Sequence, residues 1–503
     1  MPAPANCRRP PGPSPLGTRL APAIALVAMV LTTATSLPAR ATGLLVARFG
    51  GEWGHPMSDD LWSIYYNPAG LSLLDATKLA LSGSFAWRAM SYTRGEAALD
   101  DVLEDPDVGA GTPQGAGISA NTGEATLSNF LVTPFFAVGS DFGIDGFGAA
   151  LGFYVPIGGQ SIWDRKASSP EFPGAEDGAQ RWWTIEGTIR SMYATAAAGY
   201  RIAPLRLSVG AGLNVVISEI DNIQARNVDG TDNLVANGRL QEGRARIDVS
   251  SVDLAVSLGL LWEPIDHLFI GLSYQSQPGF GEQRLTGDVD LVLGSGPVPE
   301  STRTAAEVRQ SMPDVLRFGV RYGAPKSWEV RLFGDWARWS VLTEQCILNA
   351  TVADRSCVGD APPGKIIIIP RHWKDAWGVR GGGSWWATPD LELVLGGGWD
   401  GNAVPDAMVE PALYDGDKFH LTLGAKLTVG DALEVMLSYS QIIYPDRDIA
   451  ARGRVPKDPN DPTGATWTDI ATIGLRDAVR VPDAAGQYTH AVGVVELGMS
   501  YRF

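Results

Sequence analysis

The sequence lacks long apolar runs beyond its N-terminal region. No stretch after that region approaches the roughly 18 apolar residues with which a helix spans a bilayer, even though 45% of the 503 residues are hydrophobic. This excludes a membrane protein built from many helices. Charged residues are also scarce, at 19%, whereas aromatic residues reach 9%. Disordered chains have few aromatic residues and a high charge density, so the composition argues against disorder.

Basic residues are fewer than acidic ones. The 40 lysines and arginines and the 56 aspartates and glutamates give a net charge of −16 and an isoelectric point near 4.8. An acidic surface repels phosphate backbones, so we expect no nucleic-acid partner. The motifs HExxH, GxSxG, the P-loop and paired CxxC are absent from the sequence, and we expect neither a cofactor nor a specific metal-binding site.

The first 41 residues have the pattern of a secretory signal peptide. Arg8, Arg9 and Arg19 precede a short apolar stretch, Leu20–Leu31, and a small-residue cleavage site follows at Ala39–Ala41. A disordered basic tail is the alternative. Export of the protein is the expectation that follows.

Cysteine is rare, with three residues in the chain. Cys7 lies within the expected signal peptide, so the mature chain keeps Cys346 and Cys357 within one polar stretch. An exported protein can hold disulfides, and we expect these two residues to form a disulfide that staples a loop. A metal site would need more ligands than this segment offers.

From residue 78 onward, short segments alternate between apolar and polar side chains. The segment 419–428 places phenylalanine, leucine and alanine on one face and histidine, threonine, glycine and lysine on the other. Segments 268–275, 316–322 and 433–440 follow the same rule. A period of two is the signature of β-strands with one apolar face.

Such strands fit either a soluble sandwich or a membrane barrel, and three features favour the barrel. The polar faces carry glycine, serine, threonine and isolated charges, as expected for a lumen. Aromatic residues lie near segment ends, as in interfacial girdles: Trp87, Tyr274, Tyr322, Trp336 and Tyr439. Six short turns also alternate with seven long polar stretches, which predicts about fourteen strands of roughly ten residues. Those long stretches include 277–313 and 341–371, and we expect them to face outward while the short turns face the periplasm.

The chain ends on an alternating segment with aromatic residues at Tyr501 and Phe503. A last strand of this kind resembles the assembly signal of bacterial outer-membrane barrels, which would make the barrel assembly machinery a partner. A domain that ends on any apolar strand is the alternative.

Residues 42–77 differ from the rest because they show no clear alternation from residue 43 onward. Asp59 and Asp60 precede a short helical segment, Leu61–Tyr66, at its positive end. Asn67-Pro68-Ala69-Gly70 follows. An asparagine cap before a proline also suits an ordinary helix start.

In this context the chain resembles the FadL-type family of outer-membrane transporters for long-chain fatty acids and other hydrophobic compounds. The motif 58–71 is similar to the family's Asn-Pro-Ala segment, and 316–322, 334–340 and 373–380 are similar to its later strands. The resemblance implies an all-β transmembrane barrel of about fourteen strands (78–503) with an N-terminal hatch (42–77) in its lumen. It also implies passive, hatch-gated uptake across the outer membrane of a Gram-negative type cell, with release sideways through a gap in the wall.

We expect the ligand-binding residues to be large apolar or cationic side chains on polar strand faces. The candidates are Phe269, Phe333 and Met436, with Arg317 and Arg321 as carboxylate partners. The alternative is that the first three pack against the hatch and that the arginines form ion pairs on the next strand. Loop acids as a whole are expected to hold divalent ions that bridge to lipopolysaccharide.

Two other functions compete with transport of hydrophobic compounds. A general porin for small hydrophilic solutes would need an open lumen, which the 35-residue segment before the first strand argues against. An enzyme that modifies lipids would need a serine nucleophile with a histidine partner. Of the five histidines, His420 alone lies mid-strand on a polar face, and no serine partner is identifiable from spacing.

Overall fold

The computed structural model describes residues 48–99, 120–165, 177–227, 232, 234–236, 239–240, 242–293, 300–359, 362–449 and 482–503. These residues belong to the compact unit Arg40–Phe503. The expected signal peptide, with Cys7, lies outside them. No helix in this part of the chain is long and apolar enough to cross a membrane.

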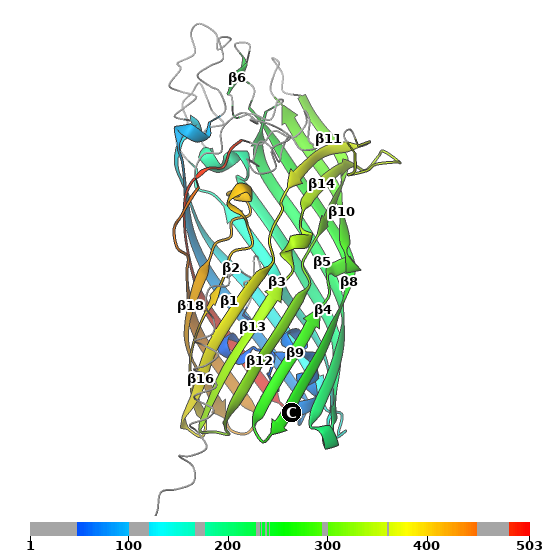
Figure 1. The fold of residues 1–503 in the computed structure, drawn as a ribbon, viewed down its shortest axis with the longest axis vertical. Coiled ribbons are helices and arrows are strands. Elements are labelled where there is room, and N and C mark those ends of the chain that lie inside the picture. The colour runs from blue at the N-terminus through cyan, green and yellow to red at the C-terminus, as the bar shows by residue number, and fades with distance from the viewer. Residues whose placement is uncertain are drawn as a thin grey trace, which may run out of the picture. The chain divides into compact units, whose positions relative to one another are not determined.

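Nineteen β-segments pair antiparallel in one sheet, and the last segment pairs with the first (Figure 1). Nine of them are uninterrupted barrel strands: β1 (Lys78–Arg94), β2 (Gly123–Ser140), β3 (Phe147–Ile162), β4 (Glu186–Ile202), β5 (Leu207–Arg226), β8 (Gly243–Ile265), β17 (Leu391–Asp400), β18 (Lys418–Val429) and β21 (Gly486–Arg502).

The other ten segments combine in pairs, each pair forming one interrupted strand. These are β9 (Leu268–Gln275) with β10 (Glu282–Leu293), β11 (Glu300–Ser311) with β12 (Val315–Ala324), β13 (Trp328–Ala337) with β14 (Glu344–Asn349), β15 (Lys365–Pro370) with β16 (Ala376–Thr388), and β19 (Leu433–Ile443) with β20 (Arg447–Ile449). In the described residues the result is a closed barrel of fourteen antiparallel strands, which confirms the predicted fold class.

The remaining elements are short. One separate pair of strands consists of β6 (Val235–Ala236) and β7 (Arg239–Leu240). The helical turns are η1 (Gly51–Trp53), α2 (Ser63–Tyr66), η2 (Pro68–Leu73), η3 (Glu96–Ala98), η5 (Ala179–Trp182), η6 (Ala203–Leu205), η7 (Pro278–Phe280), η8 (Trp339–Val341) and η9 (Asp406–Met408).

The two ends of the barrel differ. The six short connections all lie at one end, together with the C-terminus, and we call this the turn end (Figure 1). The longer connections lie at the opposite end, the loop end. Strict up-and-down pairing between neighbours produces this segregation, because every second connection returns to the same end.

In the half of the barrel near the turn end, apolar side chains point outward. On β18, Phe419, Leu421 and Leu423 are each at least half exposed, whereas His420 and Thr422 between them are buried in the lumen. A soluble sandwich would bury the leucines instead. An apolar outer band with a polar interior is the arrangement of a transmembrane barrel.

Toward the loop end, the strands are longer than the predicted ten residues, and the polarity of their faces is reversed. The stretches 277–313 and 341–371, which we expected to be loops, contain β10 with β11 and β14 with β15. On β10, Glu282 and Asp288 point outward, while Leu285 and Val289 are buried in an apolar cluster on the inner face. Charged outer faces suit water above a bilayer, so these strands extend beyond the lipid, and their polarity made them resemble loops.

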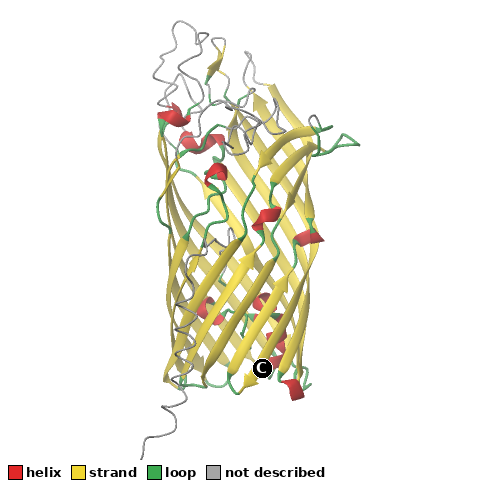
Figure 2. Cartoon of the chain, in the orientation of Figure 1, coloured by secondary structure: helices red, strands yellow, loops and turns green. Residues whose placement is uncertain are grey.

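The hatch segment 48–77 packs inside the barrel near the turn end, where Figure 2 draws its short helices within the ring of strands. Glycines on the inner wall allow the close approach. A Cβ at Gly148 would meet the carbonyl oxygen of Leu71 at 1.9 Å, and one at Gly210 would meet the backbone nitrogen of Ala69 at 2.3 Å. These inward-facing glycines leave room for the hatch backbone to pack closely against the wall.

Candidate functional site

The Asn-Pro-Ala-Gly motif is the point at which the hatch is joined to the wall. Asn67 caps η2 by accepting from the backbone N–H of Ala69 at 3.1 Å. Its Nδ2 donates to the carbonyl oxygens of Pro56 and of Leu260 on β8, each at 2.8 Å. One buried amide therefore satisfies a helix start, a second hatch segment and a barrel strand.

An aromatic cluster joins the hatch to β2 and β3. Phe49 lies with its ring centroid 5.3 Å from Phe135 and 5.6 Å from Tyr154. Trp62 packs on Phe135 at 4.6 Å, and Tyr65 packs on Tyr154 at 5.2 Å. This part of the hatch is therefore in direct contact with both strands.

The five residues expected to bind ligand lie against the hatch. Phe333 packs on Met57 of the hatch, with Phe269 beside the same cluster, and Met436 belongs to the core cluster that the hatch shares with the wall. Arg317 lies 4.4 Å from the ring of Tyr65. These contacts correspond to the alternative in which the side chains pack against the hatch.

Arg321 ties β12 to the hatch. It binds Asp59 at 2.7 Å and approaches Glu329 at 3.6 Å. Burial would raise the pKa of Asp59, but the Arg321 guanidinium outweighs it and lowers that pKa. Burial, with the charge of Asp59, raises the pKa of Asp60 to about 7. These groups line a cavity of about 320 Å³ at the turn end, which is polar and faces the hatch.

The histidine considered for catalysis is held by charged neighbours. His420 Nε2 contacts Asp400, whose two carboxylate oxygens also accept from Nη2 of Arg380. The His420 Nδ1 has no partner among the described residues. Among the described residues, no nucleophile contacts the His420 imidazole.

Two other predicted features have clear positions. Cys346 and Cys357 form a disulfide with a Cα–Cα distance of 6.0 Å, between β14 and the connection that follows it. At the opposite end, the exposed ring of Phe503 contacts that of Tyr501 at 4.9 Å. The role of these two rings in assembly stays a prediction.

The barrel wall is interrupted between β2 and β3. These strands pair from Ser140↔Ala149 to Phe135↔Tyr154 and then separate, although β1–β2 and β3–β4 stay paired. A single bridge, Leu127↔Trp163, rejoins them near the loop end. We call the unpaired stretch, 128–134 on β2 and 155–162 on β3, the window.

A bulge in β3 explains where the window begins. Tyr154 pairs with Tyr193 of β4, but the next pair is Ile157 with Ser191, so β3 holds one extra residue. Pro156 lies in the bulge and has no N–H to offer a neighbour. The aromatic cluster beneath Phe135 and Tyr154 therefore forms the lower rim of the window.

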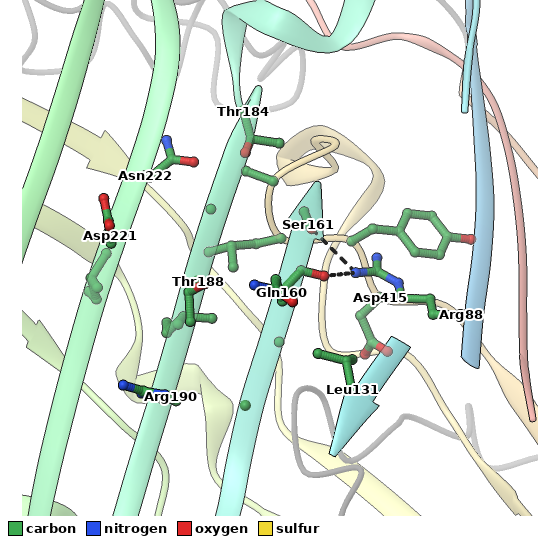
Figure 3. A pocket seen from close by; sticks show the side chains of 18 of the residues that line it. Arg88, Leu131, Gln160, Ser161, Thr184, Thr188, Arg190, Asp221, Asn222 and Asp415 are labelled. Atoms are coloured by element: carbon green, nitrogen blue, oxygen red, sulfur yellow. Dashed lines mark hydrogen bonds between the residues drawn. The ribbon is translucent and has the colours of Figure 1, made fainter. Parts of the chain in front are cut away.

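Side chains bridge the window near its upper rim. The carbonyl oxygen of Gln160 on β3 accepts from Asn129 Nδ2 on β2 at 2.7 Å and from Arg88 Nη1 on β1 at 3.1 Å. The same Arg88 nitrogen donates to Ser161 Oγ at 3.3 Å (Figure 3). Arg88 thus reaches past β2 to the strand beyond it.

A cavity of about 410 Å³ opens onto this window, a size typical of ligand pockets. Its lining includes residues of the window on both strands, among them Leu131 of β2 and Val155 of β3. Its upper wall is apolar and comes from the loop-end strands: Ile220, Ile247, Val308, Ile347, Ile367 and Ile369.

Four arginines line the cavity, and Arg88 differs from the others. Arg371 pairs with a glutamate at 2.5 Å, Arg190 at 2.6 Å and Arg48 at 3.9 Å. In the residues that the structure describes, Arg88 has neutral partners alone, including His490 Nε2 at 2.9 Å and Met90 Sδ at 3.3 Å. The cavity is thus apolar with one cation that lacks a carboxylate partner there.

The sequence analysis did not identify Arg88, His490 or the window. Residues 88–127 and 158–186 resembled loops because polar residues are frequent in them. One signal was present: Pro156 directly follows the alternating run that ends at Val155, and proline inside a strand marks a bulge or an edge.

Comparisons with known proteins agree with this architecture. The family model described as "Outer membrane protein transport protein (OMPP1/FadL/TodX)" matches residues 29–469. A FadL homologue from Pseudomonas aeruginosa has a similar solved structure, with a TM-score of 0.66, 17% identity and coverage of 93% of this chain and 99% of that one.

Two toluene transporters are similar as well. TodX of Pseudomonas putida has a TM-score of 0.58 and 15% identity, covering 93% of this chain and 99% of its own. TbuX of Ralstonia pickettii has the same TM-score and identity, with coverage of 92% and 99%. At these identities the likeness concerns the fold. No curated protein sequence matches the chain significantly.

Proposed function

The chain belongs to the OMPP1/FadL/TodX family of outer membrane transport proteins, and from this premise we propose that it takes up long-chain fatty acids or similar hydrophobic compounds by passive, hatch-gated diffusion. An outer membrane has no ATP pool or ion gradient to drive uptake. The barrel therefore works by binding the solute and letting it diffuse onward.

The observation that carries the proposal is a cavity that opens onto a gap in the wall. An apolar solute first binds the isoleucine-rich upper wall and then descends to the window between β2 and β3. From the window it leaves sideways into lipid. Release into water instead would cost about 0.8 kcal/mol for each CH₂ group, which favours the sideways route.

The hatch acts as the gate in this scheme. Phe49 and Trp62 pack beneath the last paired residues of β2 and β3, so a small movement of the hatch changes the lower rim of the window. The hatch also lies in the lumen near the turn end, packed against the inner wall. Low, unsteady single-channel currents are expected, whereas large steady currents would favour the porin.

A carboxylate on the ligand fits this cavity better than a pure hydrocarbon does. Arg88 presents a cation without a carboxylate partner among the described residues, in a cavity whose lining is mainly apolar, and a buried cation is costly unless it is paired. The solved relatives include toluene transporters, so aromatic hydrocarbons are the competing ligand class. Uptake of labelled palmitate against labelled toluene separates the two.

Deleting Val155 tests the route. The deletion removes the extra residue of the β3 bulge, which lets β3 continue beside β2 and close the window. We expect palmitate uptake to fall to background while the barrel keeps its heat-modifiable gel mobility. Val155→Ala keeps the chain length and serves as the control. Normal uptake by the deletion variant would remove the window from the route.

Lipopolysaccharide and the barrel assembly machinery are the further partners that we propose. The charged outer faces toward the loop end, with Asp288 and Asp290 among their acids, support contact with the headgroup layer through divalent ions. Tyr501 and Phe503 are the residues proposed for assembly.

A further inference from the structure

Arg88 holds the window from the inside. It lies on β1, yet its guanidinium reaches β3 and donates to Gln160 and Ser161 there (Figure 3). The intervening strand contributes Asn129, which donates to the same Gln160 carbonyl at 2.7 Å. Because backbone pairing is missing within the window, these side-chain bonds hold β3 to β1 and β2 there, and the Leu127↔Trp163 bridge rejoins the strands farther along.

The neutral partners of Arg88 are weak competitors for a guanidinium. A carboxylate brings an opposite charge and can accept from two guanidinium nitrogens at once, which the single neutral acceptors around Arg88 cannot do. Donors beside Arg88 are also unused in the described part of the chain: His490 Nδ1 and Tyr414 Oη, both on the cavity wall, have no partner there. Since Arg88 donates to His490 Nε2, the imidazole proton is on Nδ1.

The geometry of Arg88 makes carboxylate binding and the window bonds compete. Nη1 serves Gln160 and Ser161, while Nη2 contacts the poor acceptor Met90 Sδ. A carboxylate held by both terminal nitrogens takes Nη2 and needs a proton of Nη1. The Gln160 carbonyl keeps Asn129 as its donor, so the exchange leaves this buried acceptor paired, while the Ser161 hydroxyl loses its bond to Arg88.

We infer that Arg88 is a latch operated by the ligand's carboxylate. A fatty acid in the cavity draws the guanidinium away from Gln160 and Ser161, which removes two of the three side-chain bonds that hold β3 here and leaves the bond from Asn129. That part of β3 loosens, and the window through which the acid leaves widens. A neutral chain of equal length does not release the latch. This inference rests on the proposed function, because it requires the acid to enter the cavity.

The width of the window can be measured in the full-length barrel in lipid vesicles. Spin labels at Leu131→Cys and Gly158→Cys report the distance between the rims, and a side chain at Gly158 meets its nearest atom at 3.7 Å, an ordinary contact. Cys346 and Cys357 are already paired with each other. We expect palmitate, and not hexadecanol, to lengthen this distance.

The Arg88→Met variant should show the same distance with and without palmitate. Arg303→Met, which removes an ion-paired arginine from the outer face, should respond like the unmodified barrel. An unchanged distance in the unmodified barrel at saturating palmitate would overturn the latch.

Affinity supplies the second readout. Arg88→Met should weaken palmitate binding about tenfold, as expected for loss of one charge-assisted bond, and leave hexadecanol binding unchanged. Equal losses of affinity for palmitate and hexadecanol would mean that Arg88 has only a structural role. If the unmodified barrel binds neither ligand, the proposed function fails; if it binds both without movement of the window, the latch alone fails.

Discussion

Asn67 shows how a single side chain can decide the position of a whole segment. Its amide bonds to Ala69, Pro56 and Leu260, which belong to η2, to the preceding part of the hatch and to β8. Gly259 on the wall leaves room for it, since a Cβ there would meet the Asn67 Oδ1 at 2.0 Å. The motif is therefore a fastening between hatch and wall, in addition to a helix cap.

Replacing Asn67 with Ala should alter transport and leave the barrel intact. The change leaves backbone groups of Pro56, Leu260 and Ala69 without this partner, each at a cost of about 1–3 kcal/mol, and the hatch loosens. The barrel ladder is untouched. Labelled palmitate uptake and heat-modifiable gel mobility measure the two effects. Asn349→Ala at the loop end is the control, and normal uptake by Asn67→Ala would contradict a gating role for the hatch.

Individual strands of this barrel change character along their length. β10 and β11 lie above the apolar band, with charged outer faces and an apolar inner face. The connection that follows β14 folds over β11. It is held by the Cys346–Cys357 disulfide and by Arg355, which donates to Glu307 at 2.5 and 3.0 Å. In the described residues, this part of the loop end is thus cross-linked by a disulfide and an ion pair.

The connection over β11 should loosen in acid. Burial favours protonated Glu307, but hydrogen bonds from Arg355 and Arg309 outweigh it and lower the pKa below its usual 4.5. A lowered folded-state pKa means that the stabilisation is complete above the unfolded value and is lost as pH falls through the folded one.

Hydrogen exchange of the amides at 350–358, corrected for intrinsic rates, measures this effect. Protection should decrease below about pH 4.5 in the native protein, near the unfolded-state pKa. Glu307→Gln should show the low protection already at pH 7. Equal protection in both proteins at pH 7 would show that the ion pair does not hold the connection.

The whole molecule is divided into two zones of opposite polarity. The lower zone has leucines outside and polar groups within, while the upper zone has charges outside and isoleucines within. The cavity lies where the zones meet, and the window is on the adjoining stretch of wall. This arrangement supports the proposed route, in which a solute passes along the apolar cavity lining to the window.

A charge placed on the outer face should be costly in the lower zone alone. Leu423→Lys, midway along β18, should destabilise the folded barrel by about 2–4 kcal/mol, as lysine does near a bilayer midplane. Thr286→Lys on the outer face of β10 should cost less than about 1 kcal/mol. Urea unfolding from lipid vesicles measures both. Equal costs would mean that lipid does not end between the two positions.

The sequence determined the barrel and its strand number, because a period of two and an alternation of short and long connections are local properties. It also marked Asn67–Gly70 as a distinct motif. It did not determine the upper strands, since charged outer faces above the lipid resemble loops, nor the sites of Phe269, Met436 and Arg317, since a large inward side chain packs on a hatch or lines a cavity with the same spacing.

Only the tertiary structure decided where the wall opens and which cation faces the opening. The window depends on pairing between strands, and Arg88 is distinguished by its neutral partners, which come from β3 and β21. Periodicity fixes which way a side chain points. What it meets there depends on residues distant in the sequence that closure of the barrel brings together.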